Sequence, residues 1–284
     1  LIANRGEIAC RIIATARKLG IHTIAIYSDA DANARHVRLA DAAYSVGGSP
    51  ATESYLQIDN VLDVAQKSGA EAIHPGYGFL SENADFAQAC VDKGVVFIGP
   101  PPDAVRLMGA KDQARILMNR AGVPVVPGCN DLNIDLKVVL SEARKIGYPV
   151  IIKAASGGGG RGMRIVDEEL QLPEALKSAS RESMTAFANN KLLLEKFIQD
   201  PRHIEVQIFV DQHGNAVHMF ERDCSIQRRY QKVIEEAPGP TVSDELRRHL
   251  TEAALTAAKA IHYVGAGTVE FLLDEDGSFY FMEM

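Results

Sequence analysis

The chain has 284 residues, of which 46% are hydrophobic and 24% are charged, with 23 glycines and 12 prolines. This balance is typical of an ordinary globular protein and excludes a disordered, fibrous or disulfide-scaffold chain. At roughly 100 to 150 residues per domain, the length suggests about two domains. No apolar run approaches the ~20 residues of a membrane-spanning helix, so we expect a soluble protein with no membrane partner.

The charge and the cysteines exclude further classes. Thirty Lys and Arg against 37 Asp and Glu give a net charge of −7, which argues against a nucleic-acid partner or an anionic membrane. No Cys-x-x-Cys pair occurs, so neither a zinc site nor a disulfide framework is indicated, and a reducing compartment fits best. The four cysteines are Cys10, Cys90, Cys129 and Cys224.

In the first hundred residues, short β-branched runs alternate with helical stretches. The pattern predicts strands over 1–3, 22–27, 72–74 and 95–98, and helices over 6–19 and 82–93. Strands and helices that take turns imply parallel strands with crossover helices. Three prolines at 100–102 can continue neither a helix nor a central strand, so they mark a domain boundary. Two helices, over 103–108 and 111–121, follow them.

The remainder predicts an α+β lobe and then an antiparallel platform. In the lobe, over 125–198, we expect helices 138–146 and 174–188 and strands 150–154, 163–166 and 192–196. Beyond Pro201 the pattern gives strands 203–210 and 216–221, a helix over 244–261 and a closing hairpin over 268–283. The domain bounds expected from these patterns are 1–99, 100–124, 125–198 and 199–284.

Both ends of the chain are abrupt. The first residue, Leu1, lies in an apolar run with no initiator methionine and no targeting segment before it. The last residue, Met284, ends a predicted strand without a cap or a polar tail. We therefore expect a fragment of a longer polypeptide, truncated at both ends.

A glycine run joins two apolar strands. Residues 156–163 read Ser-Gly-Gly-Gly-Gly-Arg-Gly-Met, a loop rich in free backbone N–H groups that could receive an anion. The run lacks the Lys-Ser/Thr pair and the following helix of a P-loop, and it is no dinucleotide fingerprint. A flexible surface loop is the alternative. Lys153, three residues upstream on a predicted strand, favours a site that grips a phosphate.

Two glutamates are predicted to meet across the last hairpin. Asp276-Gly277 is a strong two-residue turn, so Glu275 should pair with Ser278. Cross-strand residue numbers should then sum to about 553, which sets Glu270 opposite Glu283. Such a like-charge pair is destabilising unless a divalent cation compensates it. A register slipped by one residue, or two acids that face water, are the alternatives.

A basic stretch with one aromatic residue covers 221–232. Its pattern fits the wall of a pocket for a small anion, such as phosphate or bicarbonate, or a solvated charged edge. Binding to nucleic acid is the weakest interpretation because the chain is acidic.

Several blocks resemble the biotin carboxylase family in order along the whole chain. The block over 74–83 separates this resemblance from carbamoyl-phosphate synthetases, which share the ATP-binding half. The blocks are Leu-Ile-Ala-Asn-Arg-Gly-Glu-Ile-Ala at 1–9, His-Pro-Gly-Tyr-Gly-Phe-Leu-Ser-Glu-Asn at 74–83, Tyr-Pro-Val-Ile-Ile-Lys at 148–153, Glu-Arg-Asp-Cys-Ser at 221–225 and Glu-Glu-Ala-Pro at 235–238.

The resemblance implies a Rossmann-like N-terminal domain followed by an ATP-grasp domain with a mobile glycine-rich lid, truncated at its C-terminal end. It implies a ligase in which ATP phosphorylates bicarbonate to carboxyphosphate, whose carboxyl group passes to biotin on a carrier protein. ATP and Mg²⁺ or Mn²⁺ are then the cofactors. The implied partners are the biotin carboxyl carrier, a carboxyltransferase and a second copy of the chain, in the bacterial cytoplasm or the mitochondrial matrix.

The resemblance also implies residue roles. Lys232 is the bicarbonate-side lysine, and Glu270 and Glu283 are the metal ligands. The ATP-binding residues are Lys111, Lys153, Gly159, Gly160, Glu195, Lys196, Phe197, Ile198, His203, Gln227 and Tyr230.

Two departures from the family pattern qualify these roles. Tyr230 stands where the family commonly has histidine, and the segment with the main catalytic arginine would follow Met284. We therefore expect the fragment to bind Mg-ATP without carboxylating biotin. A different ATP-grasp ligase and a non-catalytic ATP-binding module are the alternatives. The acyl acceptor is not determined; an acyl-CoA carboxylase α subunit is favoured over the N-terminal part of a pyruvate carboxylase.

Overall fold

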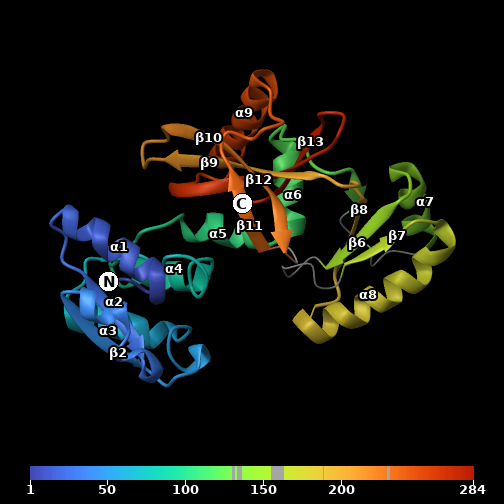
Figure 1. Cartoon of the computed structure of the whole chain (residues 1–284). Coiled ribbons are helices and arrows are strands. Elements are labelled where there is room, and N and C mark those ends of the chain that lie inside the picture. Colours follow the sequence, from blue (N-terminus) through green and yellow to red (C-terminus); the bar gives the residue numbers. More distant parts are fainter. Residues whose placement is uncertain (130–131, 133–135, 155–162, 188, 229–230) are drawn as a thin grey trace. The chain divides into compact units, whose positions relative to one another are not determined.

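In the computed structural model, the described residues are 1–129, 132, 136–154, 163–187, 189–228 and 231–284. They form two units, Leu1–Arg106 and Leu107–Met284 (Figure 1). No helix among the described residues is long and apolar enough to cross a membrane. The predicted domain bounds remain predictions.

Parallel strands build the first unit, as the alternating pattern predicts. Its elements are α1 (Gly6–Lys18), β1 (Ile24–Ser28), α2 (Arg35–Leu39), β2 (Ala42–Gly47), α3 (Ile58–Ser68), β3 (Ala72–Ile73), α4 (Ala84–Asp92), β4 (Val96–Phe97) and the 3-10 turns Asp29–Asp31 and Ala51–Glu53. The boundary after Arg106 falls within the next helix, α5 (Pro102–Gly109). Strand β1 pairs in parallel with β2, and β3 with β4. Ile2 forms parallel bridges to Ala25 and His74, so it lies between the two pairs. This order is that of a doubly wound sheet, which reverses at its first strand.

The strand predicted over 1–3 is therefore a single bridged residue. After this bridge the chain no longer pairs with the neighbouring strands. The side-chain amide of Asn4 instead donates to the carbonyls of Pro75 and Tyr77 at 2.9 and 2.7 Å. The core of this unit combines buried strand residues such as Ile26 and Ile73 with Phe86 of α4. Helix α4 begins where the Asn83 side chain accepts the N–H of Phe86 at 2.8 Å, a typical N-cap.

The second unit contains the predicted lobe and platform. Its elements are α6 (Lys111–Arg120), β5 (Gly128–Cys129), α7 (Leu136–Ile146), β6 (Val150–Ala154), β7 (Arg164–Val166), a 3-10 turn (Glu169–Gln171), α8 (Leu172–Phe187), β8 (Leu192–Lys196), β9 (Arg202–Val210), β10 (Ala216–Arg228), β11 (Gln231–Glu236), α9 (Asp244–Ala260), β12 (Gly265–Leu273) and β13 (Phe279–Glu283). Strand β10 is longer than predicted, because it continues through much of the basic stretch.

The lobe is a four-stranded antiparallel sheet in the order β5-β8-β6-β7. Helix α8, yellow in Figure 1, runs along β6 and β7. Val150 and Ile152 of β6 and Leu192 and Leu194 of β8 belong to the core that the helices cover. Because successive strand residues point to opposite faces, Lys153 lies on the other face.

The platform is a five-stranded antiparallel sheet in the order β11-β10-β9-β12-β13. Strand β9 alternates, with Ile204, Val206 and Ile208 fully buried. Helix α9 packs against β9 and β10, and its N-terminus is capped by the Ser243 hydroxyl. The opposite face of β9 carries polar residues, including Glu205.

The turn of the closing hairpin differs from the prediction. The N–H of Asp274 donates to the carbonyl of Ser278 at 2.8 Å, so the loop holds the three residues 275–277 and Glu275 does not pair with Ser278. Gly277 has a φ of 87°, the left-handed conformation that a three-residue hairpin loop requires at this position. The predicted two-residue turn is therefore wrong.

The predicted glutamate pair is nevertheless confirmed. Next to the turn, the strand pairing is shifted by one residue from the predicted pairing. The shift extends from the pair Leu273–Phe279 to the pair Phe271–Phe281. An irregularity between Glu270 and Phe271 then restores the predicted pairing, and Glu270 lies opposite Glu283. A β-bulge of this kind adds one residue to one strand only, so it cancels the extra residue in the loop.

Candidate nucleotide and anion site

A row of charged residues crosses the platform on the face opposite α9. The register sets Arg222 of β10 beside Glu205 of β9, Glu205 beside Glu270 of β12, and Glu270 beside Glu283 of β13. Opposed side chains on neighbouring strands have Cβ atoms about 5 Å apart. Three carboxylates in adjacent positions repel one another unless cations lie between them.

Lys232 of β11 supplies such a cation. Its Nζ donates to Glu205 Oε2 at 2.5 Å and to Glu270 Oε1 at 2.7 Å, so one ammonium group bridges two carboxylates. The other carboxylate oxygen of Glu205 accepts from Arg222 Nε at 2.5 Å. The Lys232 side chain is 26% exposed, against 5% for Glu205 and 13% for Glu270. The network is therefore largely withdrawn from water.

These contacts determine the charge states. Burial raises the pKa of Glu270, but hydrogen bonds from His203 and Lys232 outweigh it, and the net pKa lies below the ordinary value. Burial lowers the pKa of Lys232, and its bonds to Glu205 and Glu270 raise it further than burial lowers it. Glu270 is thus a carboxylate and Lys232 an ammonium at neutral pH.

His203 and Gln227 form a chain of hydrogen bonds to Glu270. Gln227 Nε2 lies 2.6 Å from His203 Nδ1 and also donates to the carbonyl of Cys224 at 2.8 Å. The amide nitrogen is a donor, so Nδ1 of His203 accepts and Nε2 carries the proton of the neutral ring. Nε2 lies 2.6 Å from Glu270 Oε2 and donates to it.

A second pair joins helix α6 to the last strand. Lys111, the first residue of α6, has its Nζ 3.7 Å from Glu283 Oε2. The two side chains are 36% and 47% exposed, so water competes with this pair. Glu283 is therefore paired more loosely than Glu270.

A third group lies on the lobe. Lys153 of β6 donates from Nζ to Glu195 Oε2 of β8 at 2.6 Å. The two residues are diagonal neighbours on one face, since the register pairs Lys153 with Leu193. Arg115, one turn after Lys111 on α6, has its Nε 3.7 Å from Glu195 Oε1. Helix α6 thus carries cations directed to carboxylates of both the lobe and the platform.

The predicted hinge, 195–198, is fixed largely by hydrogen bonds from its backbone N–H groups to carbonyls of other segments. The N–H of Lys196 donates to the carbonyl of Pro127 at 2.8 Å, and that of Phe197 to the carbonyl of Pro149 at 3.1 Å. The Lys196 ammonium donates to the carbonyls of Gly147 and Tyr148, both at 3.0 Å. Ile198 is buried.

The structure thus gathers most of the described candidate residues into three cation–carboxylate groups, whereas Lys196, Phe197 and Ile198 lie in the hinge. The candidates Gly159, Gly160 and Tyr230 lie outside the described residues. Sequence reasoning did not name Arg115 or Glu205 as site residues, and it included Arg222 only as part of the basic stretch over 221–232. A glutamate inside a predicted apolar strand was a usable signal for Glu205, because acids are rarely buried without a partner.

One further set of donor atoms resembles a metal site. Oxygen and sulfur atoms of Glu205, Cys224 and Glu235 lie within 4.8 Å of one another. Glu205 already accepts from two cations, and burial together with the Glu205 charge raises the pKa of the Cys224 thiol to about 12. A protonated thiol is a poor metal ligand, so we assign no metal to this group.

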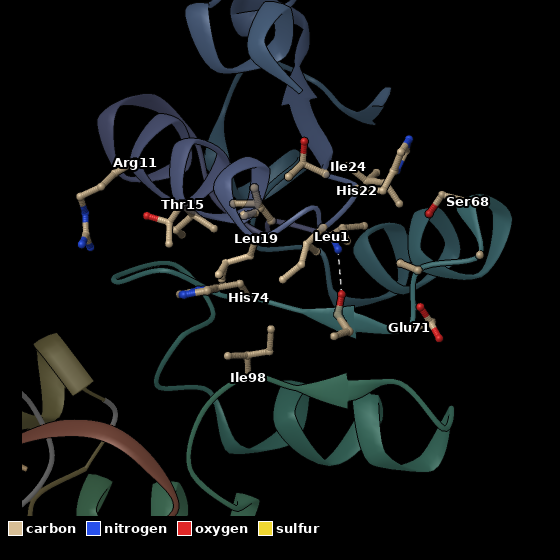
Figure 2. Close-up of a pocket in the computed structure, with 18 residues that line it drawn as sticks. Leu1, Arg11, Thr15, Leu19, His22, Ile24, Ser68, Glu71, His74 and Ile98 are labelled. Atoms are coloured by element: carbon tan, nitrogen blue, oxygen red, sulfur yellow. Dashed lines mark hydrogen bonds between the residues drawn. The ribbon is translucent and has the colours of Figure 1, made fainter. Parts of the chain in front are cut away.

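The first unit contains a cavity of about 470 Å³ (Figure 2). Leu1, Leu19 and Ile98 contribute to its lining, and the amine of Leu1 donates to the carbonyl of Ala72 at 2.7 Å. None of the candidate residues lines it. We therefore do not assign the nucleotide to it.

The family models divide the chain between two domains. Residues 1–105 match the biotin carboxylase N-terminal domain. Residues 110–284 match the ATP-binding domain of the carbamoyl-phosphate synthase L chain.

Curated relatives cover the whole chain. It is 56% identical to the mitochondrial methylcrotonoyl-CoA carboxylase subunit alpha of Dictyostelium discoideum over 284 residues, which are 100% of this chain and 41% of that protein. It is 54% identical to the chloroplastic biotin carboxylase of Arabidopsis thaliana and 51% identical to biotin carboxylase 1 of Bacillus subtilis, of which it covers 53% and 63%. The chain therefore spans about half the length of these relatives.

Solved structures agree. A biotin carboxylase-beta-gamma-ATP complex from Campylobacter jejuni has a TM-score of 0.95 at 49% identity, over 100% of this chain and 64% of that one. The biotin carboxylase domain dimer of the Hydrogenobacter thermophilus 2-oxoglutarate carboxylase, in complex with MgADP, ADP and bicarbonate, has a TM-score of 0.92 at 49% identity, over 100% and 62%. These matches confirm the predicted Rossmann-like and ATP-grasp folds, and the chain belongs to the biotin carboxylase family.

Proposed function

We propose that this chain binds Mg-ATP and is the nucleotide-binding part of a biotin carboxylase. In the proposed reaction, ATP phosphorylates bicarbonate to carboxyphosphate, whose carboxyl group then passes to biotin on a carrier protein. The observation that carries the proposal is the set of three cation–carboxylate groups, around Lys111, Lys153 and Lys232. Relatives with beta-gamma-ATP, MgADP and bicarbonate support it.

The proposed phosphate ligands are Lys111 and Lys153. Each holds a carboxylate here, Glu283 and Glu195 respectively. A lysine that already pairs with an anionic oxygen can transfer to a phosphate oxygen without loss of its charge compensation. The glycine-rich residues Gly159 and Gly160 are proposed as backbone donors to the same phosphates, and residues 195–198 as the adenine hinge.

The proposed metal ligands are Glu270 and Glu283. Their opposed positions on adjacent strands fit a hard divalent cation, since Mg²⁺ and Mn²⁺ prefer carboxylate oxygens and phosphate oxygens. When bound, the ion would neutralise phosphate charge. His203 orients Glu270 through its Nε2 proton, and Gln227 fixes that tautomer. Tyr230 is proposed as a further nucleotide contact.

Lys232 is proposed as the lysine on the bicarbonate side. Its ammonium is held between Glu205 and Glu270, so it supplies a fixed positive charge beside the proposed metal ligands. Negative charge that develops on bicarbonate and phosphate oxygens is stabilised best by such preorganised groups.

The proposed partners are the biotin carrier, a carboxyltransferase and a second copy of the chain. The acyl-CoA carboxylase interpretation is supported by the methylcrotonoyl-CoA carboxylase subunits among the relatives, whose names place them in mitochondria. Because the chain covers 41% of the first of these relatives, we propose that it binds nucleotide without carboxylating biotin by itself.

Calorimetric titration of the chain with Mg-ATP tests the binding step. We expect binding that Lys153→Met weakens at least tenfold, the equivalent of about 1.4 kcal/mol, whereas Lys177→Met, at an exposed position of α8, leaves it unchanged. For the reaction, the chain is extended to the length of its relatives and ADP release is measured with and without bicarbonate and biotin. Tight binding without dependence on either would support a non-catalytic module instead.

A further inference from the structure

We propose that Arg115 is a positioning residue that keeps Glu195 paired when Lys153 turns from Glu195 to the nucleotide phosphates. The inference rests on the proposed function, because it concerns how that site releases its phosphate lysine. Glu195 is 8% exposed, so it needs a cation at every stage.

The two cations hold different oxygens of Glu195. Lys153 Nζ lies 2.6 Å from Oε2, and Arg115 Nε lies 3.7 Å from Oε1. Departure of Lys153 therefore leaves the contact with Arg115 in place. A buried carboxylate that loses its last cation costs far more than one that keeps a second.

Arg115 is anchored where it stands. Its guanidinium donates to the carbonyl of Val126 at 2.7 Å and 3.3 Å through two nitrogens, and its side chain is 14% exposed. It comes from helix α6, whereas Lys153 and Glu195 come from β6 and β8. These bonds tie the guanidinium to the backbone, so it stays beside Glu195 while Lys153 moves.

The platform repeats the arrangement. Lys232, the proposed bicarbonate lysine, bridges Glu205 and Glu270, and each of these carboxylates has a second donor. Arg222 donates to Glu205, and His203 to Glu270. By contrast, Glu283 beside Lys111 is half exposed, so water solvates it when Lys111 leaves. A second donor thus accompanies each buried carboxylate that holds a substrate lysine.

The test measures how Arg115→Gln changes the affinity of the chain for Mg-ATP and for adenosine. Glutamine removes the charge and keeps a donor for Val126. We expect Mg-ATP affinity to fall at least about tenfold and adenosine affinity to change less than about twofold, because adenosine leaves Lys153 on Glu195. Arg115→Lys, which restores a cation, should recover most of the Mg-ATP affinity. Arg120→Gln, at the exposed end of α6, is the matched control.

A double-mutant cycle isolates the pair. In a Glu195→Gln background there is no buried charge to keep paired, so Arg115→Gln should change Mg-ATP affinity by less than about twofold. An equal loss in both backgrounds, or an equal loss for adenosine and Mg-ATP, would overturn the inference. If Arg115→Gln does not fold, as judged by circular dichroism, the same comparison is made with Arg115→Lys, for which the inference expects near-native Mg-ATP affinity. Absence of Mg-ATP binding by the unsubstituted chain would overturn the proposed function itself.

Discussion

Replacement of Lys232 by methionine tests whether its ammonium stabilises the folded platform, in addition to its proposed role on the bicarbonate side of the site. Its Nζ lies 2.5 and 2.7 Å from two carboxylates whose side chains are 5% and 13% exposed. Removal of one partner from a buried ion pair costs about 3–5 kcal/mol when it leaves an uncompensated charge. Because Arg222 still pairs with Glu205 and His203 still bonds to Glu270, we expect Lys232→Met to cost less than this, about 2 kcal/mol. Lys111→Met removes an exposed lysine at 3.7 Å and should cost less than about 1 kcal/mol.

The pH dependence of this loss has a definite sign. In the unsubstituted chain the net pKa of Glu270 is lowered, so its stabilisation is present above the unfolded pKa and is lost as the pH falls through the folded pKa. Without Lys232, Glu270 loses one of the two side-chain donors that lower its pKa while its burial remains, so its pKa rises relative to the unsubstituted chain. The folded variant then takes up this proton at a higher pH than the unsubstituted chain does, so the stability difference between the two shrinks as the pH falls.

Urea unfolding followed by far-ultraviolet circular dichroism measures both effects, since the chain has no tryptophan. The unfolding free energies of the unsubstituted chain, Lys232→Met and Lys111→Met are compared from about pH 3 to about pH 8, a range that extends below the ordinary carboxyl pKa of about 4.3. An equal loss for both lysines, or a Lys232→Met loss that does not vary with pH, would refute the reasoning.

Two further predictions concern the stability of the platform. Glu221 is buried and accepts two bonds from Arg247, at 2.8 and 3.1 Å, so Glu221→Gln should cost about 2 kcal/mol near neutral pH, whereas Asp244→Asn, at the exposed partner of the same arginine, should cost less than about 0.5 kcal/mol. Burial raises the pKa of Glu221, and the bonds from Arg247 lower it more, so its net pKa lies below the ordinary value. The stability difference between Glu221→Gln and the unsubstituted chain should therefore disappear at acidic pH, below the folded pKa. A stability difference that persists there would contradict the role of the Glu221 charge. Phe271→Ala should cost about 3–5 kcal/mol in urea unfolding because Phe271 is fully buried against Phe279, whereas Phe220→Ala, 59% exposed, should be nearly neutral; similar losses would show that burial does not set the cost.

The sequence predicted most elements because their signals are local. The strands over 150–154 and 192–196 were predicted at the bounds that β6 and β8 have. Apolar alternation and helical periodicity reflect which face is buried, and that pattern is written in the order of the residues. The extent of β10 was underestimated, because its second half is polar and becomes a strand by pairing with β11.

The glutamate pair shows where local reasoning reached its limit. Glu270 does lie opposite Glu283, although the turn between them has three residues rather than two. Turn chemistry alone cannot reveal a compensating bulge, because the bulge is selected by how the whole strand packs. The prediction was therefore right that the two glutamates face each other, and wrong about the turn length and the register of the strand residues next to the turn.

What the sequence by itself determined is the family, the order of the elements and most of the charged residues of the site, because motifs and periodicity are local properties. What only the tertiary structure decided is how those charges are paired. Glu205, Arg222 and Arg115 carry no local signal of their partners, since their contacts join β9, β10, β11, α6 and β8. Such contacts depend on strand register and helix placement, and only the folded chain specifies these.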